Sequence, residues 1–473
     1  MRISRSNELG ERLGCALSQS KDLVRLDLDG RVNVSTMAAG TSARTSVLDD
    51  RAGRMRARFV LGMDWLVVNA LAGAGDPMAR VLSGSPRTDV YADYERIRAR
   101  GDLAAWRLGV HSVVSREKAE EILRDPRFGV QPTAELTPSR FDLAQGPLSG
   151  SFLELDPPRH TRLRRLTAPA FRPRLIRDFT PVVEQVLTEV LDRLEGRDRF
   201  DLMTDLADVF PIAVISRLLG IPEADAGHFS RIGALVGQSL DGVRTVRQAQ
   251  QLRAASRELA VLFRRLADER RREPQDDVIS LLATAEAGGE LTAEDLVATC
   301  GLLLVAGFET TVNLIGNAVV ALHAEPEAWS RLVADPGLAE AAAEEALRFE
   351  PPVQLTVRFA REDVELDGHR LPRATVLAVL LAAANRDPAA YADPGRFRLD
   401  RQGEPEHLAF SSGIHYCLGA PLARLEGPLA LRALAERWPD LTLLPGARRR
   451  TGTTIRGYAS LPVGTSRTTV PKR

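Results

Sequence analysis

The sequence predicts one large, mainly α-helical domain with small β-sheets at one side. Helical hydrophobic patterning dominates from Asp76 onward and is interrupted by Pro/Gly punctuation such as Pro157-Pro158. No period of 20 to 50 residues repeats, which excludes a solenoid. Patterning of β type is confined to three short stretches, too few for a sheet-dominated fold: residues 108–114, 357–366 and 376–381. We therefore expect a single domain over residues 76–473.

The front of the chain differs from this domain. Residues 1–58 are polar, rich in Arg and Ser and without clear periodicity, which predicts a disordered extension. Met37, followed by small residues, is a candidate for the true start of translation. Residues 59–75 are apolar enough to dock on the domain as a helix, but Asp64 and Asn69 make a membrane span there unfavourable. Without the pattern of a secretory signal, the protein is expected to be cytoplasmic, with no transmembrane segment.

One helix is expected to cross the whole domain. It begins at Thr292, with Asp295 in the capping position, and meets no proline before about His323. At 1.5 Å per residue this helix is roughly 45 Å long. Apolar residues on both sides of its middle predict that it is buried.

Composition excludes several classes of function. The 63 basic residues are balanced by 63 acidic ones, so the chain has no net field that would attract nucleic acid. Three cysteines cannot form a disulfide framework, and they lie in no CxxC pair. Seven histidines without a close cluster make a zinc enzyme a poor interpretation.

Polar residues interrupt the apolar middle of the long helix. Ala306-Gly307-Phe308-Glu309-Thr310-Thr311 places a carboxylate and two hydroxyls where unpaired polar groups cost several kcal/mol. Gly307 and a mid-helix Thr can open a widened turn that holds a small ligand or water. A satisfied polar contact between helices explains the segment equally well.

Glu345 and Arg348 lie at i and i+3 on a helix that Pro351-Pro352 ends. A surface pair of this kind contributes only tenths of a kcal/mol, so the motif is weak evidence by itself.

The most specific signal is the segment Phe410-Ser411-Ser412-Gly413-Ile414-His415-Tyr416-Cys417-Leu418-Gly419. A helix predicted to start at Cys417 places its thiolate beside backbone N–H groups and the positive helix end, which suits a metal-bound thiolate. Gly413 and Gly419 would let a planar group approach the backbone. Cys15 and Cys300 are expected to be ordinary small hydrophobic residues.

This segment resembles the haem-ligand loop of the cytochrome P450 monooxygenases. AGFETT is similar to the oxygen-activation helix of that family and EALR to its Glu-x-x-Arg motif, in the same order and spacing from about Asp76 to the end. The resemblance implies a P450-type domain in which the long helix crosses over haem b (iron protoporphyrin IX). It also implies a bacterial haem monooxygenase, an oxidoreductase of class EC 1.14.

The resemblance implies roles for particular residues. Cys417 would be the axial ligand of the haem iron, with Gly419 beside the cofactor. Glu309 and Thr310 would be catalytic and would supply the protons used in oxygen activation. A buried structural network would join Glu345, Arg348 and Arg396.

Haem also carries two propionates, which need cationic or hydrogen-bonding partners in an apolar pocket. His160 and Arg164 match the His-x-x-x-Arg of the family, Arg358 follows the segment Val353 to Val357, and His415 precedes the ligand by two residues. All four are expected to bind the cofactor.

The substrate is expected to be an apolar small molecule over the haem. The predicted pocket is lined by Ala306, which would also touch the cofactor, and by Gly307, Val353 and Leu355, with loops near residues 129–149 and 237–243.

Electrons would come from NAD(P)H through a separate ferredoxin and ferredoxin reductase, because the chain has no room for a flavin or nicotinamide domain. Exposed arginines near the His160 helix would face the acidic ferredoxin: Arg162, Arg165, Arg172 and Arg174. The alternatives are a haem-thiolate peroxygenase or isomerase, against which Glu309 and Thr310 argue, and a haem carrier or gas sensor without turnover.

Overall fold

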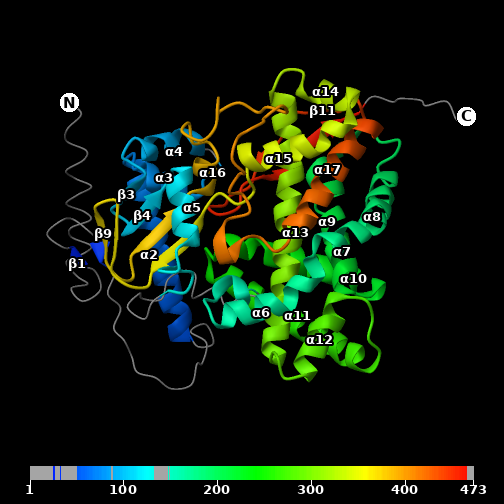
Figure 1. Cartoon of the computed structure of the whole chain (residues 1–473), viewed down its shortest axis with the longest axis horizontal. Helices are drawn as coiled ribbons and strands as arrows, with labels where there is room; N and C mark the ends of the chain where they lie inside the picture. The colour runs from blue at the N-terminus through cyan, green and yellow to red at the C-terminus, as the bar shows by residue number, and fades with distance from the viewer. Residues whose placement is uncertain are drawn as a thin grey trace, which may run out of the picture.

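The computed structural model describes residues 25–26, 32–33, 51–86, 89–132, 148 and 150–465. Its described part is mainly helical with small sheets, which confirms the predicted fold class. Figure 1 shows α13 in the middle of the molecule, with the sheet region and α3–α5 on one side and most of the other helices on the opposite side.

The helices are α2 (Arg51–Gly73), α3 (Pro77–Ser83), α4 (Val90–Arg98), α5 (Arg116–Arg124), α6 (Arg159–Thr167), α7 (Pro173–Asp178), α8 (Thr180–Asp192), α9 (Phe210–Leu219), α10 (Glu223–Gly237), α11 (Val246–Arg272), α12 (Val278–Ala287), α13 (Ala293–Ala324), α14 (Ala328–Ala334), α15 (Ala339–Phe349), α16 (Leu381–Ala384) and α17 (Ala420–Arg437). Short helical turns connect them: η2 (Phe152–Glu154), η3 (Ala168–Phe171), η4 (Leu202–Ala207), η5 (Gln238–Asp241), η6 (Pro336–Leu338) and η7 (Gly413–His415).

The strands are β1 (Arg25–Leu26), β2 (Val32–Asn33), β3 (Leu103–Ala105), β4 (Val110–Val113), β5 (Phe128–Gly129), β6 (Arg199–Asp201), β7 (Thr356–Ala360), β8 (Val364–Leu366), β9 (His369–Leu371), β10 (Val376–Val379), β11 (Thr442–Leu443), β12 (Arg448–Arg449), β13 (Tyr458–Ser460) and β14 (Pro462–Gly464). The three stretches predicted to be β-rich contain β4, β7 with β8, and β10.

The largest sheet has five strands in the order β3-β4-β10-β7-β5. Strand β10 pairs parallel to β4 and antiparallel to β7, with Leu377 opposite Arg358. A second sheet, β11-β14-β6, joins the end of the chain to its middle, and the remaining strands form two-stranded pairs. Residues 199–201 and 462–464 are thereby brought side by side.

The long helix α13 has the predicted start. Thr292 Oγ1 accepts a hydrogen bond from the Asp295 N–H at 3.1 Å, and Asp295 accepts one from the Thr292 N–H at 3.2 Å. These reciprocal bonds satisfy two N–H groups that a helix start leaves free. The helix is α-helical along its whole length, so the widened turn considered for its polar middle is not present. The Thr310 hydroxyl instead donates to the Ala306 carbonyl oxygen at 3.0 Å.

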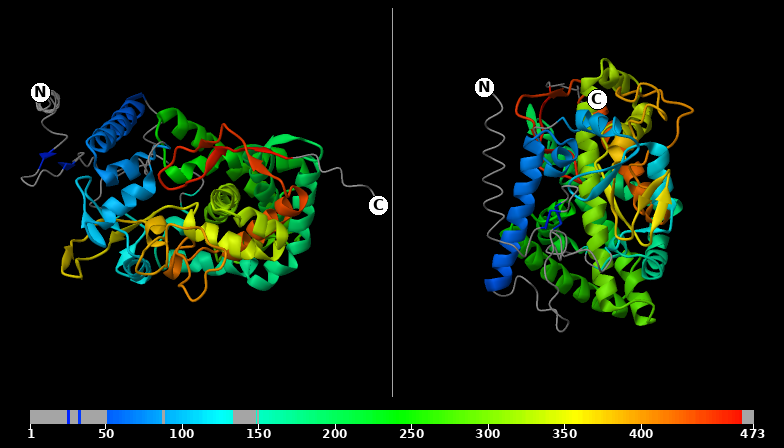
Figure 2. Two further views of the ribbon diagram at one scale, coloured as in Figure 1. Left: turned by 90° about the horizontal axis from the view of Figure 1, so that it is seen from above. Right: turned by 90° about the vertical axis from the view of Figure 1, so that its left-hand side faces the viewer.

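By length and composition, α13 is the one described helix that could cross a membrane, not the segment 59–75 considered from the sequence. Most of its apolar surface is buried inside the domain. It is therefore the core helix of the fold, seen end-on in the left view of Figure 2.

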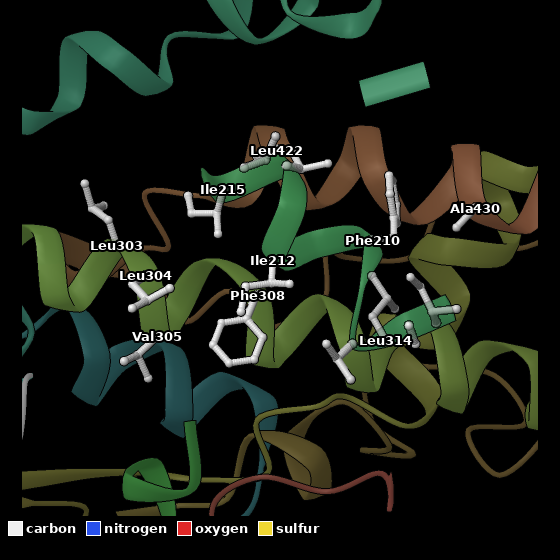
Figure 3. Close-up of a cluster of buried hydrophobic side chains, with 14 of the residues drawn as sticks. Phe210, Ile212, Ile215, Leu303, Leu304, Val305, Phe308, Leu314, Leu422 and Ala430 are labelled. Atoms are coloured by element: carbon white, nitrogen blue, oxygen red, sulfur yellow. The ribbon is translucent and has the colours of Figure 1, made fainter. Parts of the chain in front are cut away.

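The close crossing of α9 and α13 explains Gly307. A side chain at this position would begin 2.9 Å from Cδ1 of Ile215 on α9. Figure 3 shows Ile212 and Ile215 of α9 facing the α13 residues Leu304 and Phe308. The missing side chain of Gly307 thus serves helix packing, a role that the sequence interpretation did not give it.

Helix α2 begins at Arg51, eight residues before the predicted start at 59, and runs along one side of the molecule (Figure 2, right). It packs mainly on α3, and its Leu61 is buried in the large apolar core cluster, while Trp65 is 65% exposed and Leu66 46% exposed. The rest of the predicted extension, Met37 included, lies outside the described residues except for the antiparallel pair β1 and β2.

Glu426 lies in the middle of α17 and is completely buried. Neither of its carboxyl oxygens has a hydrogen-bond partner among the described residues. Burial raises the pKa of Glu426 well above its ordinary value, so the folded protein holds this side chain as a neutral acid.

We expect Glu426→Gln to remove a pH dependence of stability. Unfolding releases a proton from this group whenever the pH is above about 4.3, so the free energy of unfolding of the wild type falls as pH rises. The free energy of unfolding of the variant, relative to that of the wild type, should therefore rise by about 1.4 kcal/mol per pH unit between about pH 4.3 and the pKa of Glu426 in the folded state. Urea unfolding from pH 5 to 8 measures this, with the exposed Glu436→Gln of the same helix as control. Parallel stability curves for wild type and Glu426→Gln would contradict it.

Candidate active site

The loop before α17 presents Cys417 at the end of the η7 turn. The Cys417 N–H donates to the Phe410 carbonyl oxygen at 2.8 Å, which closes the loop on itself. Helix α17 begins at Ala420, three residues after the position predicted from the sequence. The thiol therefore lies in front of the helix N-terminus rather than inside its first turn.

The two glycines of this loop have different roles. Gly413 has φ +69°, and a Cβ there would lie 2.4 Å from the Leu123 carbonyl oxygen at the end of α5. Gly413 allows the loop to pack on α5. The sequence interpretation had proposed a different role, the close approach of a planar group to the backbone. A Cβ on Gly419 would meet only the Cys417 sulfur, at 4.0 Å. Gly419 therefore keeps the space beside the thiol open.

The surroundings of Cys417 favour a thiolate once a cation binds it. Burial raises the pKa of the Cys417 thiol, while the N–H groups of Gly419 and Ala420 and the charge of Arg164 lower it. By contrast, Cys300 is fully buried in α13, where burial raises the pKa of its thiol without a cation to oppose it. Cys300 behaves as a small core residue, as expected, and Cys15 lies outside the described residues.

Four basic side chains gather beside the Cys417 loop, although they come from three distant parts of the chain. His160 and Arg164 come from α6, Arg358 from β7 and His415 from η7. The rings of His160 and His415 are 4.3 Å apart between centroids, and the Arg164 guanidinium donates to the Tyr416 carbonyl oxygen. The structure thus brings together all four residues predicted to bind the propionates.

This basic cluster lacks matching acids. Both ring nitrogens of His160 and Nε2 of His415 are buried without hydrogen-bond partners among the described residues. Arg358 is 2% exposed and donates only to Thr356 Oγ1 and to the Val357 carbonyl oxygen. Asp156 is the acid whose charge reaches Arg358 and His160, and it accepts hydrogen bonds from the N–H groups of residues 130 and 131.

Burial and mutual repulsion shift the titration of the cluster. Burial lowers the pKa of Arg358 to about 10 and the pKa of His415 to about 3, the latter with help from the charge of Arg358. A buried cluster of donors with a single nearby carboxylate, Asp156, is unfavourable unless further anions bind it. Two propionates supply the two negative charges and the acceptors that this cluster lacks, so the residues present fit haem.

The polar middle of α13 contains the only opening in the central part of that helix. Every described residue from 298 to 319 is buried except Ala306, Gly307 and Thr310, which are partly exposed. Ala306 and Thr310 are four residues apart and therefore lie on one side of the helix, with Gly307 beside them toward α9. An otherwise buried helix is therefore accessible at the side that carries the Thr310 hydroxyl.

Glu309 points to a different set of partners. Its carboxylate forms an ion pair with Arg450, and Asn313 Nδ2 lies 3.5 Å from Oε1. The side chain is 3% exposed, and burial raises the pKa of Glu309 while the Arg450 charge opposes that rise. Among the hydrogen bonds of the described residues, none joins the Glu309 and Thr310 side chains.

Glu345 and Arg348 form a buried bidentate pair, with donor–acceptor distances of 2.7 and 2.8 Å. The third cation of this network is Arg401, whose Nε lies 2.9 and 3.0 Å from the two Glu345 oxygens. Arg396 was expected in this place, but its side chain is 65% exposed and pairs with Glu325. Arg396 contributes only its carbonyl oxygen, which accepts from Arg348 and Arg401.

Two residues predicted to line a substrate pocket, Leu355 and Val353, contact other parts of the protein. Leu355 is buried in an apolar cluster with Met78 and Leu380 of the sheet region. Val353 is partly exposed and forms an isolated antiparallel bridge with Ile455. Gly237 lies in a loop predicted to line the pocket, but it packs against Glu309. A Cβ at this position would lie only 2.3 Å from Glu309 Oε2, so no larger residue fits there.

Sequence patterns did not indicate Arg401, Arg450 or Asp156. Arg401 and Arg450 are two arginines among many. Their partners, Glu345 and Glu309, lie 56 or more residues away in the sequence. Asp156 stands directly before Pro157-Pro158, so the segment had been interpreted as punctuation only.

Residues 101–336 and 337–438 match the family profile described as Cytochrome P450. Cytochrome P450 monooxygenase PikC of Streptomyces venezuelae is 40% identical over 387 residues, which are 79% of this chain and 91% of that protein.

Solved structures give the same result. The ligand-free crystal structure of CYP164A2 of Mycobacterium smegmatis is similar with a TM-score of 0.75 and 39% identity, over 82% of this chain and 99% of that chain. The same protein with Econazole bound is similar with a TM-score of 0.73 over the same shares.

Proposed function

Because this chain belongs to the cytochrome P450 family, we propose that it inserts one oxygen atom of O2 into an apolar small molecule, using electrons from NAD(P)H. In general terms it is a haem-thiolate monooxygenase. The observation that carries the finer proposal is the accessible patch of Ala306, Gly307 and Thr310 in an otherwise buried helix.

The residues proposed to hold haem are Cys417 as the iron ligand, His160, Arg164, Arg358 and His415 toward the propionates, and Ala306 and Gly419 beside the cofactor. When bound, haem supplies the redox-active iron that activates O2. The unpartnered ring nitrogens of His160 and the buried guanidinium of Arg358 support this assignment.

Thr310 and Glu309 are proposed to manage the protons of the reaction. The Thr310 hydroxyl lies on the accessible side of α13, where it can hold a water molecule by hydrogen bonding. Glu309, whose pKa is raised by burial, can take up a proton and pass it toward that water. Proton supply by an acid and an alcohol favours oxygenation over peroxygenase, isomerase or carrier functions.

An apolar substrate is supported by the small, uncharged residues of the patch. With Leu355 in the core, Ala306 and Thr310 are the residues of this chain proposed to contact the substrate.

The electron donor is proposed to be a ferredoxin, itself reduced by a ferredoxin reductase, with the protein acting in the cytoplasm. All four predicted arginines are exposed, namely Arg162, Arg165, Arg172 and Arg174, and Arg162 also pairs with Asp295 at 3.0 Å. The exposed apolar side chains Leu175 and Ile414 lie on the same segments as these arginines and the Cys417 loop. Cationic residues around a small apolar centre suit an acidic protein partner.

Thr310→Ala is expected to keep haem and substrate binding but to lower product formed per NAD(P)H oxidised by at least about tenfold, with a matching rise in hydrogen peroxide. The hydroxyl that holds the proton-accepting water is lost, while the helix keeps its shape. Thr310→Ser, which retains the hydroxyl, should recover most of the coupling. Product, peroxide and NAD(P)H are measured in the same reaction with a ferredoxin donor.

Wild-type coupling in Thr310→Ala would refute the role of this hydroxyl. Product formation from hydrogen peroxide alone, with none from O2 and a donor, would favour the peroxygenase alternative. No consumption of O2 under any condition would favour a carrier or sensor.

A further inference from the structure

One side of helix α2 exposes apolar residues to solvent. Trp65 and Leu66 are adjacent on this side, and both are exposed. The other exposed positions between residues 61 and 73 carry no charge either, namely Gly62, Asn69, Ala70 and Gly73. The Asn69 amide donates to the Trp65 carbonyl oxygen at 2.7 Å, so its polarity is used within the helix. Single apolar residues are common on protein surfaces, but a neighbouring pair on an uncharged side indicates contact with a partner.

Helix α11, which α2 also contacts, has a different outer side. Its exposed positions include the charged residues Arg257, Glu258, Arg264, Arg265 and Asp268. Charges of both signs keep such a side in water. Helix α2 lies at the edge of the molecule (Figure 2, right). If it served only to cover the domain, we would expect charges on its outer side in the same way.

The first part of α2 is strongly basic. Its first eight residues contain no acid and four arginines, namely Arg51, Arg54, Arg56 and Arg58. Asp49 and Asp50 precede the helix, so residues 49–58 carry four positive charges and two negative ones. Positive charge near a helix N-terminus is unfavourable unless an anion balances it. At 3.6 residues per turn, the positions of Arg51 and Arg58 share the side of the helix that carries Trp65.

A phospholipid surface matches both parts of this helix. Anionic headgroups would balance the arginines, and the hydrocarbon beneath them would take up Trp65 and Leu66. Tryptophan is favoured at the boundary between headgroups and hydrocarbon. The apolar stretch Leu61–Gly73 is too short to cross a bilayer, and Asp64 together with four arginines makes a span by the whole helix unfavourable. A helix of this composition is suited to lie in the membrane surface.

A second copy of this chain is a poorer partner for α2. In a symmetric contact, α2 would face the same helix, whose exposed positions between residues 61 and 73 offer the arginines no acid. Such a contact would bury the apolar pair but leave the basic end of the helix unbalanced.

We propose that α2 attaches the protein to the surface of an anionic phospholipid membrane. Trp65 and Leu66 insert below the headgroups, and Arg51 and Arg58 bind the phosphates beside them. Two inserted side chains and a few basic residues give weak, reversible binding rather than a permanent anchor. The inference goes beyond the proposed reaction and does not depend on it, since the residues proposed to hold haem lie in other elements of the fold.

Sedimentation of the holoenzyme with vesicles tests the attachment. The wild type should sediment with vesicles that contain phosphatidylcholine and phosphatidylglycerol, much less with phosphatidylcholine alone, and high salt should release it. Trp65→Ser/Leu66→Ser should lower the partition coefficient by at least about tenfold, because the inserted apolar surface is lost. Arg51→Gln/Arg58→Gln should lower it roughly tenfold on the mixed vesicles. Arg51→Lys/Arg58→Lys, which keeps both charges, should bind like the wild type.

Trp65 also reports its own insertion. It is the exposed member of the four tryptophans, since Trp106, Trp329 and Trp438 are buried. Its fluorescence should shift to shorter wavelength when the mixed vesicles are added, and lipids brominated near the top of their acyl chains should quench it. Trp65→Phe should keep most of the binding but lose the shift, which assigns the signal to Trp65.

The matched control is Leu175→Glu, in α7 on the opposite side of the molecule from α2 (Figure 1). Leu175 is exposed and lies beside Arg174, on the surface proposed to meet the electron donor, which is also both basic and apolar. This variant should bind vesicles like the wild type. Loss of binding in Leu175→Glu but not in Trp65→Ser/Leu66→Ser would overturn the proposal, because the donor surface would then be the contact.

Three further results would also overturn the role of α2. The first is failure of the wild type to bind either kind of vesicle, and the second is equal binding of the wild type and Trp65→Ser/Leu66→Ser. The third is a dimer of the lipid-free protein in sedimentation velocity that the same variant abolishes, without vesicle binding by the wild type. Because Trp65 and Leu66 are exposed, haem content and Tm should be the same in wild type and variant, which excludes misfolding as the cause of lost binding.

Discussion

Cys417→Ala is expected to abolish the ferrous carbonyl spectrum of thiolate-ligated haem, whereas Cys300→Ala leaves it intact. Cys417 faces the N–H groups of Gly419 and Ala420 and the charge of Arg164, all of which favour its thiolate. Cys300 has no such partners, and burial holds its thiol in the neutral form. Spectra of the reduced, carbon monoxide-treated proteins measure the difference.

Haem content provides the control for this comparison. Cys417→Ala should retain part of its haem, because His160, Arg164, Arg358 and His415 still present their donors to the propionates. A thiolate spectrum that survives in Cys417→Ala but disappears in Cys300→Ala would overturn the whole assignment of the site.

Arg401→Ala is expected to lower the free energy of unfolding by about 3–5 kcal/mol, whereas Arg396→Ala should leave it nearly unchanged. Loss of Arg401 leaves Glu345, which is 4% exposed, with an incompletely compensated charge. Loss of the Arg396 side chain removes only an exposed ion pair with Glu325. Chemical denaturation of the holoenzymes measures both values.

Arg401→Lys is the matched variant for this test. It keeps the charge but cannot reproduce the contacts of the guanidinium with Glu345, Glu404 and three carbonyl oxygens, so it should fall between wild type and Arg401→Ala. Equal losses in Arg396→Ala and Arg401→Ala would show that the network does not depend on the buried cation.

Local patterns in the sequence predicted the features that depend on local chemistry. The capping residues Thr292 and Asp295 predicted the start of α13, and the glycines around Cys417 indicated a thiol at a helix start, although α17 begins three residues later. The extent of α2 was not predictable, because residues 51–58 are too polar for the apolar pattern that identified the rest of that helix.

Partners across long distances in sequence were beyond prediction. Arg396 and Arg401 are five residues apart in one irregular segment, and their directions follow from how that segment packs on α15. The sequence suggested that Gly307 belongs to a ligand-binding site. In the structure its missing side chain makes room for Ile215, which stands almost a hundred residues earlier in the sequence. Arg450 belongs to no sequence motif, and its ion pair with Glu309 exists only because the fold brings together two distant parts of the chain.

Asp241 Oδ1 accepts hydrogen bonds from the N–H groups of Thr453, Thr454 and Ile455, and this long-range contact has a consequence for biosynthesis. Proteins emerge from the ribosome N-terminus first, at about 5–20 residues per second, and local helical contacts form before distant ones. Tyr416, the partner of Arg164, follows it by 252 residues in the sequence, and Thr453, the partner of Asp241, follows it by 212 residues. The helices around α13 therefore exist before the cysteine loop and the Arg450 turn have been made. The cofactor site thus becomes complete only after the Cys417 loop has been made, and a product truncated before residue 410 would be a largely helical body without the proposed iron ligand.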